Sequence, residues 1–111
     1  MEHLIPSFPV TVTARHMEKT EAIQRYVETK LSRIHLAYPR IIDAKAVVDH
    51  QDHHQGNSGN EVSIILHCTN QLVIQASSET KDLYEAIDLT LEKLERQMRK
   101  AKTRRLQQEG H

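Results

Sequence analysis

The sequence predicts an α+β fold, in which a single β-α-β-β-β-α domain forms a four-stranded sheet with two helices packed on one face. Three observations lead to this prediction. The chain has 111 residues, the size of one ordinary domain. Four short segments are β-branched or alternate between apolar and polar residues, as strands do. Two longer segments repeat apolar residues every three or four positions, as amphipathic helices do.

The first strand and the first helix are predicted within residues 9–35. Residues 9–14 (Pro-Val-Thr-Val-Thr-Ala) alternate between apolar and polar side chains and favour a strand. Thr20 is placed to cap the helix, which extends to about His35. Pro39 prevents any continuation. The residues of the helix that we expect to be buried are Ile23, Val27, Leu31 and Ile34.

Three further strands are predicted at residues 41–50, 61–68 and 72–77. Residues 51–60 are polar and rich in turn-forming residues, so we expect a loop there. Asn70 lies between the last two strands, as a tight hairpin requires. We expect sequential strands to pair antiparallel, with the face of the sheet opposite the helices left in water.

The last helix is predicted to start near Lys81 and to carry two stripes of side chains. With Leu83 set at zero, six apolar residues fall between roughly 0° and 80° and are expected to be buried, namely Leu83, Ile87, Leu91, Leu94, Met98 and Ala101. Four basic residues fall between about 220° and 300° and form a stripe roughly 16 Å long. This predicted basic stripe consists of Lys93, Arg96, Lys100 and Arg104.

The end of this helix sets the predicted domain boundary. Arg99 and Lys102 lie on the other flank of the helix, near acidic residues, and Arg105 would point back into the apolar stripe. We therefore expect the packed helix to end or fray near residue 103. The predicted domain covers residues 1–103, followed by a short flexible basic tail at 104–111.

Charge is divided unevenly along the chain, although the formal net charge is zero. Residues 46–92 carry a balance of −7, whereas residues 93–111 carry +5. Only Glu95 offsets the bases between Lys93 and Arg105, and Lys30 and Arg33 lie at the edge of the first helix. If the two helices pack side by side, these basic edges can merge into one surface for a polyanion.

A run of charges on a helix is usually only a solvated face, and late bases also suit the helix dipole. The extra bases of the first helix favour phosphate binding instead, because arginine and lysine neutralise phosphates and release counterions. No helix-turn-helix, zinc finger or aromatic ladder is recognisable in the sequence. We therefore expect the protein to read the shape of folded RNA, rather than base sequence.

Other site types are weaker hypotheses. Asp49, His50, Asp52, His53 and His54 with Cys68 could be a metal site, but a polar surface loop explains the histidines better. Cys68 is more consistent with a packed thiol than with a nucleophile. We expect no enzymatic activity, no cofactor, no metal and no small-molecule substrate. The first residues do not form a secretory signal, and no apolar run could cross a membrane, which indicates a soluble, cytoplasmic protein.

Two blocks of the sequence are similar to a known family. The block Thr20-Glu-Ala-Ile continues to Lys30-Leu-Ser-Arg33-Ile, and the block Asp82-Leu-Tyr-Glu-Ala-Ile-Asp continues to Lys93-Leu-Glu-Arg-Gln-Met-Arg-Lys. Both resemble the helices of the bacterial ribosome hibernation promoting factors and of the related ribosome-associated inhibitor. The resemblance extends from Val10 to about Lys102. It implies the same β-α-β-β-β-α fold and binding to RNA of the small ribosomal subunit, in the channel of messenger and transfer RNA.

The resemblance also implies that the protein silences and protects idle ribosomes. Five residues match basic positions of the family, namely Lys30, Arg33, Lys93, Arg96 and Lys100, and Lys102 matches some members. Arg99 and Arg104 are candidates on charge alone. The histidine-rich loop is long for the family, and the tail resembles the short type, for which we expect a monomer when free. Two alternatives stay open: a general double-stranded RNA-binding module acting off the ribosome, and a metal-binding or enzymatic protein.

Overall fold

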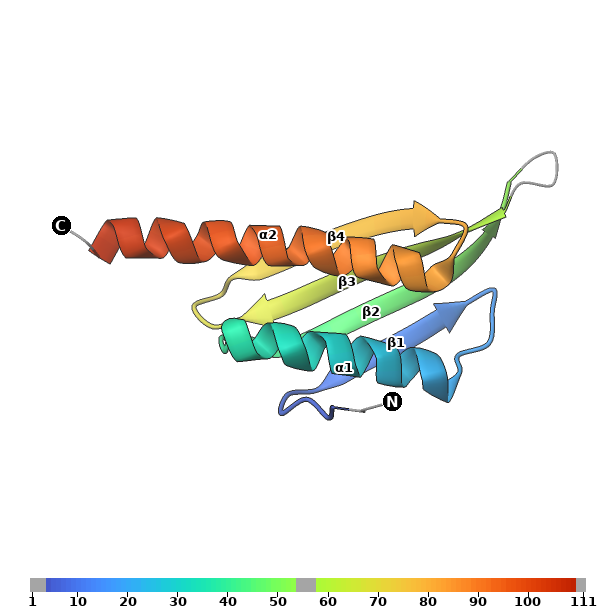
Figure 1. Ribbon diagram of the computed structural model, residues 1–111, viewed down its shortest axis with the longest axis horizontal. Helices are drawn as coiled ribbons and strands as arrows, with labels where there is room; N and C mark the ends of the chain where they lie inside the picture. Colours follow the sequence, from blue (N-terminus) through green and yellow to red (C-terminus); the bar gives the residue numbers. More distant parts are fainter. Residues whose placement is uncertain (1–3, 54–57, 110–111) are drawn as a thin grey trace.

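The computed structural model describes residues 4–53 and 58–109 of the chain (Figure 1). The elements follow the predicted order β-α-β-β-β-α, which confirms the fold class. They are β1 Val10–Arg15, α1 Glu21–Ala37, β2 Ile41–Asp52, β3 Ser58–Cys68, β4 Val73–Thr80 and α2 Leu83–Glu109.

The four strands form one mixed sheet in the order β1-β2-β3-β4. β2 and β3 are antiparallel, as are β3 and β4, but β1 and β2 are parallel, with Val10 opposite Ala44. The expectation that all sequential strands are antiparallel was therefore wrong for the first pair. The reason is α1, which returns the chain to the end of the sheet where β1 began, so that β2 must run in the same direction.

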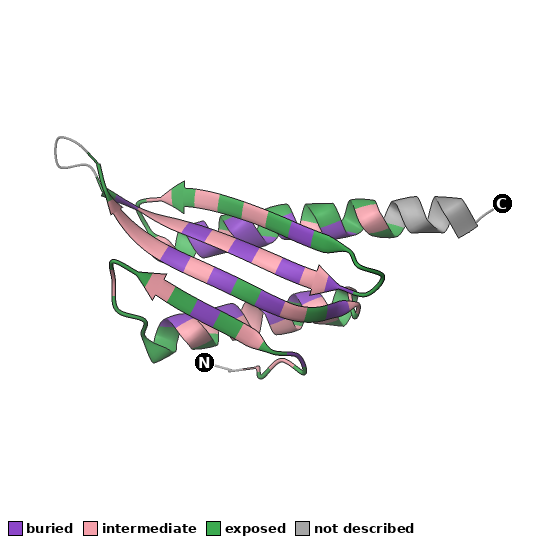
Figure 2. Ribbon diagram, turned by 180° about the vertical axis from the view of Figure 1, so that it is seen from behind, coloured by how far each residue is buried: buried purple, intermediate pink, exposed green. Residues whose placement is uncertain are grey.

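Both helices lie on one face of the sheet, and the other face is open (Figures 1 and 2). Alternation along the strands produces this division. In β3, for example, Val62, Ile64 and Leu66 are fully buried between the sheet and the helices, while the side chains between them point to the open face. The core is apolar and continuous, and the predicted stripe of α1 (Ile23, Val27, Leu31 and Ile34) is buried in it.

Local signals set the limits of α1. The Thr20 hydroxyl accepts a hydrogen bond from the backbone N–H of Ile23 at 3.2 Å, which confirms the predicted N-cap. At the other end, the backbone N–H of Tyr38 donates to the carbonyl of Ile34 at 2.9 Å, and Pro39 follows. The helix therefore extends two residues past the predicted end at His35.

The two hairpins differ in how well the sequence predicted them. Asn70 and Gln71 both have positive φ, 62° and 63°, which gives the tight β3–β4 turn the twist that matches its strands. The predicted loop at 51–60 is strand at both of its ends, residues 51–52 and 58–60, because Asp52 pairs with Ser58. Backbone hydrogen bonds extend a ladder regardless of side-chain polarity, so the polar composition misplaced the strand ends.

α2 continues to Glu109 and does not end near residue 103 as expected. Residues 103–109 contain good helix formers and no glycine or proline, so the helix persists without an apolar stripe to bury. The domain boundary at 103 stays a prediction. None of the helices in the described part of the chain combines the length and the apolar character that a membrane crossing needs.

Candidate nucleic-acid interface

The predicted basic stripe lies on the flank of α2 that runs along β4, at the outer edge of the sheet. Arg96 and Lys100 are exposed there. The Lys93 ammonium donates to the backbone carbonyl of Ser77 at 2.6 Å, and the Gln97 amide donates to the carbonyl of Gln75 at 2.8 Å. β4 is an edge strand, so these two side chains satisfy carbonyls that no neighbouring strand can pair. Lys93 keeps two further N–H donors for an outside partner.

The side chain of Arg104 lies outside the described residues, as does that of Arg105. The stripe can therefore be described from Lys93 to Lys100 only. On the opposite flank, Arg99 and Lys102 are both exposed. The Lys102 ammonium lies 5.8 Å from the centre of the Tyr38 ring, a cation–π distance.

A groove of about 360 Å³ separates α1 from α2, and its walls carry opposite charges. Lys30 and Arg33 stand on the α1 side, and three acids stand on the α2 side. These acids are Asp88, Glu92 and Glu95. The Lys30 ammonium lies 3.6 Å from the Asp88 carboxylate and 5.3 Å from the centre of the Tyr26 ring.

The expected merging of two basic edges was therefore wrong. The apolar stripe of α2 must face the sheet, and this orientation turns the acidic flank of the helix towards α1. Opposite charges across the groove attract, whereas two basic edges would have repelled each other. Arg33 is exposed and Lys30 is half-buried, so both stay near the surface, but Lys30 has an intramolecular partner.

A second contact joins the two helices at Asp88, beside the groove. The Tyr26 hydroxyl lies 2.8 and 2.9 Å from the two oxygens of the Asp88 carboxylate and donates to it. Burial raises the pKa of Tyr26 to about 12, and the hydrogen bond to Asp88 and the charge of Asp88 act in the same direction. Tyr26 therefore stays a protonated donor throughout the physiological range.

Past the acidic side chains of the groove, the charged side chains near the end of α1 are basic. Ala37 lines both the groove and a second hollow, which carries Arg40 and Lys102 and is formed where α1 ends. Sequence reasoning missed Arg40, because this residue comes after the helix-ending proline and belongs to no periodic pattern. Only the fold brings it near the second half of α2.

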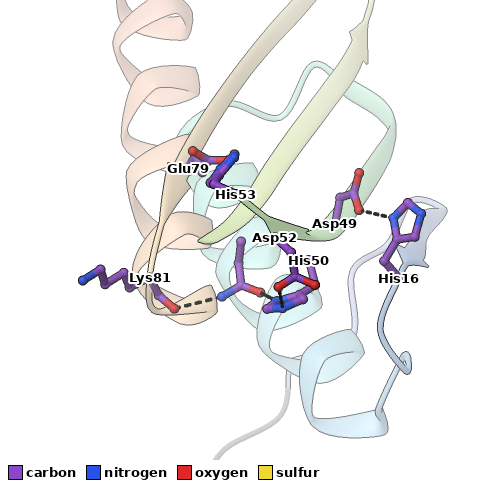
Figure 3. A network of polar contacts seen from close by, with 8 residues as sticks. His16, Asp49, His50, Asp52, His53, Glu79 and Lys81 are labelled. Atoms are coloured by element: carbon purple, nitrogen blue, oxygen red, sulfur yellow. Dashed lines mark hydrogen bonds and ion pairs between the residues drawn. The ribbon is translucent and has the colours of Figure 1, made fainter. Parts of the chain in front are cut away.

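The histidines around residues 50–53 are held in separate polar pairs (Figure 3). His16 lies 2.8 Å from Asp49, and His53 lies 3.1 Å from Glu79. His50 lies between Asp52 and Asn60, at 3.3 and 3.2 Å. The hydrogen bond with His16 is the largest influence on Asp49 and lowers the pKa of its carboxyl.

These pairs do not converge on one point. Among the described side chains, those of residues 4–53 and 58–102, no group of three or more histidine, cysteine or acidic residues is arranged to hold a metal ion. His54, which the metal hypothesis included, lies outside the described residues. Cys68 is buried at the opposite end of β3, with its sulfur 4.0 Å from that of Met98. Burial raises the pKa of the Cys68 thiol, as does the charge of Asp43, which is typical of a packed thiol.

Comparison with known proteins identifies the family of this chain. Residues 10–106 match the family model described as Sigma 54 modulation protein / S30EA ribosomal protein. The chain belongs to this family. The ribosome hibernation promotion factor of Deinococcus radiodurans is 36% identical to this chain over 97 residues, which make up 87% of this chain and 50% of that protein. The ribosome hibernation promoting factor of Azotobacter vinelandii is 29% identical over 90% of this chain and 88% of its own length.

Two solved structures have the same fold. A ribosomal subunit interface protein from Coxiella burnetii superposes with a TM-score of 0.74 over 86% of this chain and 99% of its own, at 23% identity. The N-terminal domain of Thermus thermophilus Protein Y has a TM-score of 0.62 at 27% identity, over 87% of this chain and 98% of that domain. The chain spans about half the length of the Deinococcus relative and 48% of the hibernation promotion factor of Bacillus subtilis.

Proposed function

We propose that this member of the family binds the RNA of the small ribosomal subunit, in the channel that messenger and transfer RNA would occupy, and thereby silences and protects idle ribosomes. The observation that carries this proposal is the composition of α2 after Leu91. Between Lys93 and Lys102 the helix exposes five basic side chains and has Glu95 as its single acid. The names of the family members supply the step from a polyanion to the ribosome.

The bound surface would consist of the exposed α2 bases, and Arg33 would contribute separately from the α1 side of the acidic groove. Phosphate contacts of this kind require no cofactor and no catalytic step. About five neutralised phosphates would give a slope of roughly −3.5 to −4.5 for the logarithm of affinity against the logarithm of salt concentration. Binding to ribosomes would place the protein in the cytoplasm.

The test compares two triple variants with the same change in net charge. The first is Arg96→Glu, Arg99→Glu, Lys100→Glu, which leaves Lys93 and its bond to β4 intact. The second is Arg15→Glu, Lys19→Glu, Lys45→Glu, three exposed bases away from α2. Circular dichroism and thermal unfolding first establish that both variants fold.

Sedimentation with purified small subunits then measures binding over a range of salt concentrations. We expect the α2 variant to lose co-sedimentation and the matched variant to retain most of it. Equal binding of both variants to the subunit would rule out α2 as the interface. If a plain RNA duplex competes for the wild-type protein as well as unlabelled subunits do, the protein is instead a general double-stranded RNA-binding module.

A further inference from the structure

The second hollow is a pocket of about 340 Å³ formed by three segments that lie far apart in the sequence. The end of α1 and the residues after it contribute Tyr38 and Arg40, the β3–β4 turn contributes Leu72, and α2 contributes Met98, Ala101 and Lys102. A volume of this size is at the lower end of the range found for small-molecule sites and could hold one flat ring system.

The inner wall of the pocket is apolar and its side is aromatic. Met98 is buried, Ala101 is half-buried, and the Tyr38 ring is half-buried beside them. Tyr38 is the C-cap of α1, and its backbone N–H bonds to Ile34, so the position of the ring follows that of the helix end. An aromatic ring next to a methionine suits a planar, polarisable group.

The walls are joined to one another by backbone hydrogen bonds. The N–H of Thr69 donates to the carbonyl of Arg40 at 2.9 Å, and the N–H of Cys68 donates to the carbonyl of Leu72 at 2.8 Å. The first bond holds the segment after α1 against the β3–β4 turn, and the second closes the turn itself. A ligand would therefore find the pocket already formed and would lose little free energy in ordering it.

The charges at the pocket are all positive. Arg40 and Lys102 are the two charged side chains that line the pocket, and none of its described lining residues is acidic. This distinguishes the pocket from the neighbouring groove, where three acids face the bases. Lys102 lies over the Tyr38 ring and has a long flexible side chain, so it can move aside and expose the ring to a ligand.

We propose that this pocket binds one nucleotide unit of RNA. An unstacked base lies on the Tyr38 ring against Met98 and Ala101, and the adjoining phosphate pairs with Arg40 and Lys102. The charges favour this occupant over an apolar side chain of a protein, which would give neither cation an anionic partner. This role deepens the proposed function and rests on it, because the base would come from the RNA that α2 contacts.

Two variants test the pocket, and a third serves as a control. Ala101→Phe fills it without changing a charge, and Ala22→Phe makes the same substitution on an exposed position of α1 away from the pocket. Tyr38→Leu removes the aromatic face but keeps apolar bulk. Binding of the four nucleoside 5′-monophosphates to the full chain is followed by NMR, with inorganic phosphate and the free nucleosides as separate probes.

We expect the monophosphates to shift the methyl signals of Met98 and Ala101 in the wild-type protein and the signals of Met98 in Ala22→Phe. The shifts should disappear in Ala101→Phe and weaken in Tyr38→Leu. Loss of one stacked base corresponds to a fall of about tenfold or more in affinity for small subunits, which we expect for Ala101→Phe and not for Ala22→Phe. Equal shifts from phosphate alone would overturn the role of the base, and equal binding of the nucleosides would overturn the role of the cations.

The two proposals fail separately. If Ala101→Phe binds small subunits as tightly as the wild-type protein does, while the Arg96, Arg99 and Lys100 triple variant does not bind, the pocket is wrong and the ribosome-binding function stands. If the wild-type protein fails to bind small subunits but the monophosphates still occupy the pocket, the nucleotide site stands and the ribosomal function is wrong.

Discussion

The link between Tyr26 and Asp88 should contribute measurably to the packing of α1 against α2. Tyr26→Phe removes one hydroxyl and leaves the ring, including its edge-on contact with Tyr84 at 4.9 Å between ring centres. The lost hydrogen bonds are those to the Asp88 carboxylate at 2.8 and 2.9 Å. No other interaction of the groove needs to change, because Lys30 stays within 3.6 Å of Asp88.

The size of the effect follows from the charge and the exposure of the acceptor. A hydrogen bond to a charged group contributes about 1.5–3 kcal/mol to stability when it is well shielded. The Asp88 side chain is 44% exposed and keeps Lys30, so water can replace part of the lost bond. We therefore expect Tyr26→Phe to lower the free energy of unfolding by about 1–1.5 kcal/mol, with a fall in Tm of roughly 4–6 °C for a domain of this size.

The same residue should also change the response to alkali. An unfolded chain loses the Tyr26 proton near its ordinary pKa of 10.0, whereas the folded chain holds it until about pH 12. The stability associated with this proton is therefore complete below pH 10 and is lost as the pH rises through 12. Tyr26→Phe has no such proton. The difference in free energy of unfolding between this variant and the wild-type protein should therefore shrink between pH 10 and pH 12.

Urea unfolding at pH 7.5 and at several values from pH 9 to 11 measures both effects. Tyr84→Phe is the matched control, because its hydroxyl makes no hydrogen bond recorded within the described residues. If Tyr26→Phe and Tyr84→Phe unfold at the same urea concentration at pH 7.5, the Tyr26–Asp88 bond contributes nothing and the reasoning is wrong. A double-mutant cycle with Asp88→Asn separates this coupling from the ion pair with Lys30.

Three further changes test other features of the fold. Thr90→Val should lower the free energy of unfolding, measured in urea, by about 1 kcal/mol, because the fully buried Thr90 hydroxyl lies 2.8 Å from the carbonyl of Ala86 and 3.3 Å from that of Val62. Thr90→Ser keeps the hydroxyl and should retain most of this stability. Gln71→Gly should raise stability by about 0.5–1 kcal/mol, because Gln71 has a φ of 63° that glycine adopts without strain; an unchanged Tm would contradict this. His16→Ala should raise the pKa of the Asp49 carboxyl towards its ordinary value of 3.8, which an NMR titration measures. In the wild-type protein, the stability associated with Asp49 is present above pH 3.8 and is lost as the pH falls through the lower pKa of the folded state.

Much of the fold was predictable because its signals are local. The N-cap at Thr20, the buried stripe of α1 and the turn at Asn70 each depend on a few neighbouring residues, and all three are present. The end of α2 depended on a competition between helix propensity and burial. Periodicity alone suggested that the helix would end where its apolar stripe ends, but propensity carried the helix on to Glu109.

The arrangement of charges was less predictable, because it depends on how the two helices are rotated relative to each other. The sequence correctly separated the two flanks of α2 but could not show which flank faces α1. Burial of Ile87, Leu91 and Leu94 against the sheet fixes that rotation and places Asp88 opposite Lys30. The proximity of Arg40 to Lys102 likewise arises only from folding, since 61 positions separate them in the sequence.

The lengths of the elements explain why the second half of α2 is available to a partner. The 27 residues of α2 span about 40 Å, whereas the eight residues of β4 beneath it span about 27 Å. The helix is therefore longer than β4, and it continues past the end of the sheet at which β4 begins (Figure 1). Where α2 covers the sheet beside α1, the flank of α2 that faces α1 is acidic and pairs with the bases of α1. Where α2 passes the end of α1, its described charged side chains are basic, and the pocket of about 340 Å³ opens beside them. A charge that lacks an internal partner gains most from an external one, so the phosphates of a bound RNA would meet the protein at this end.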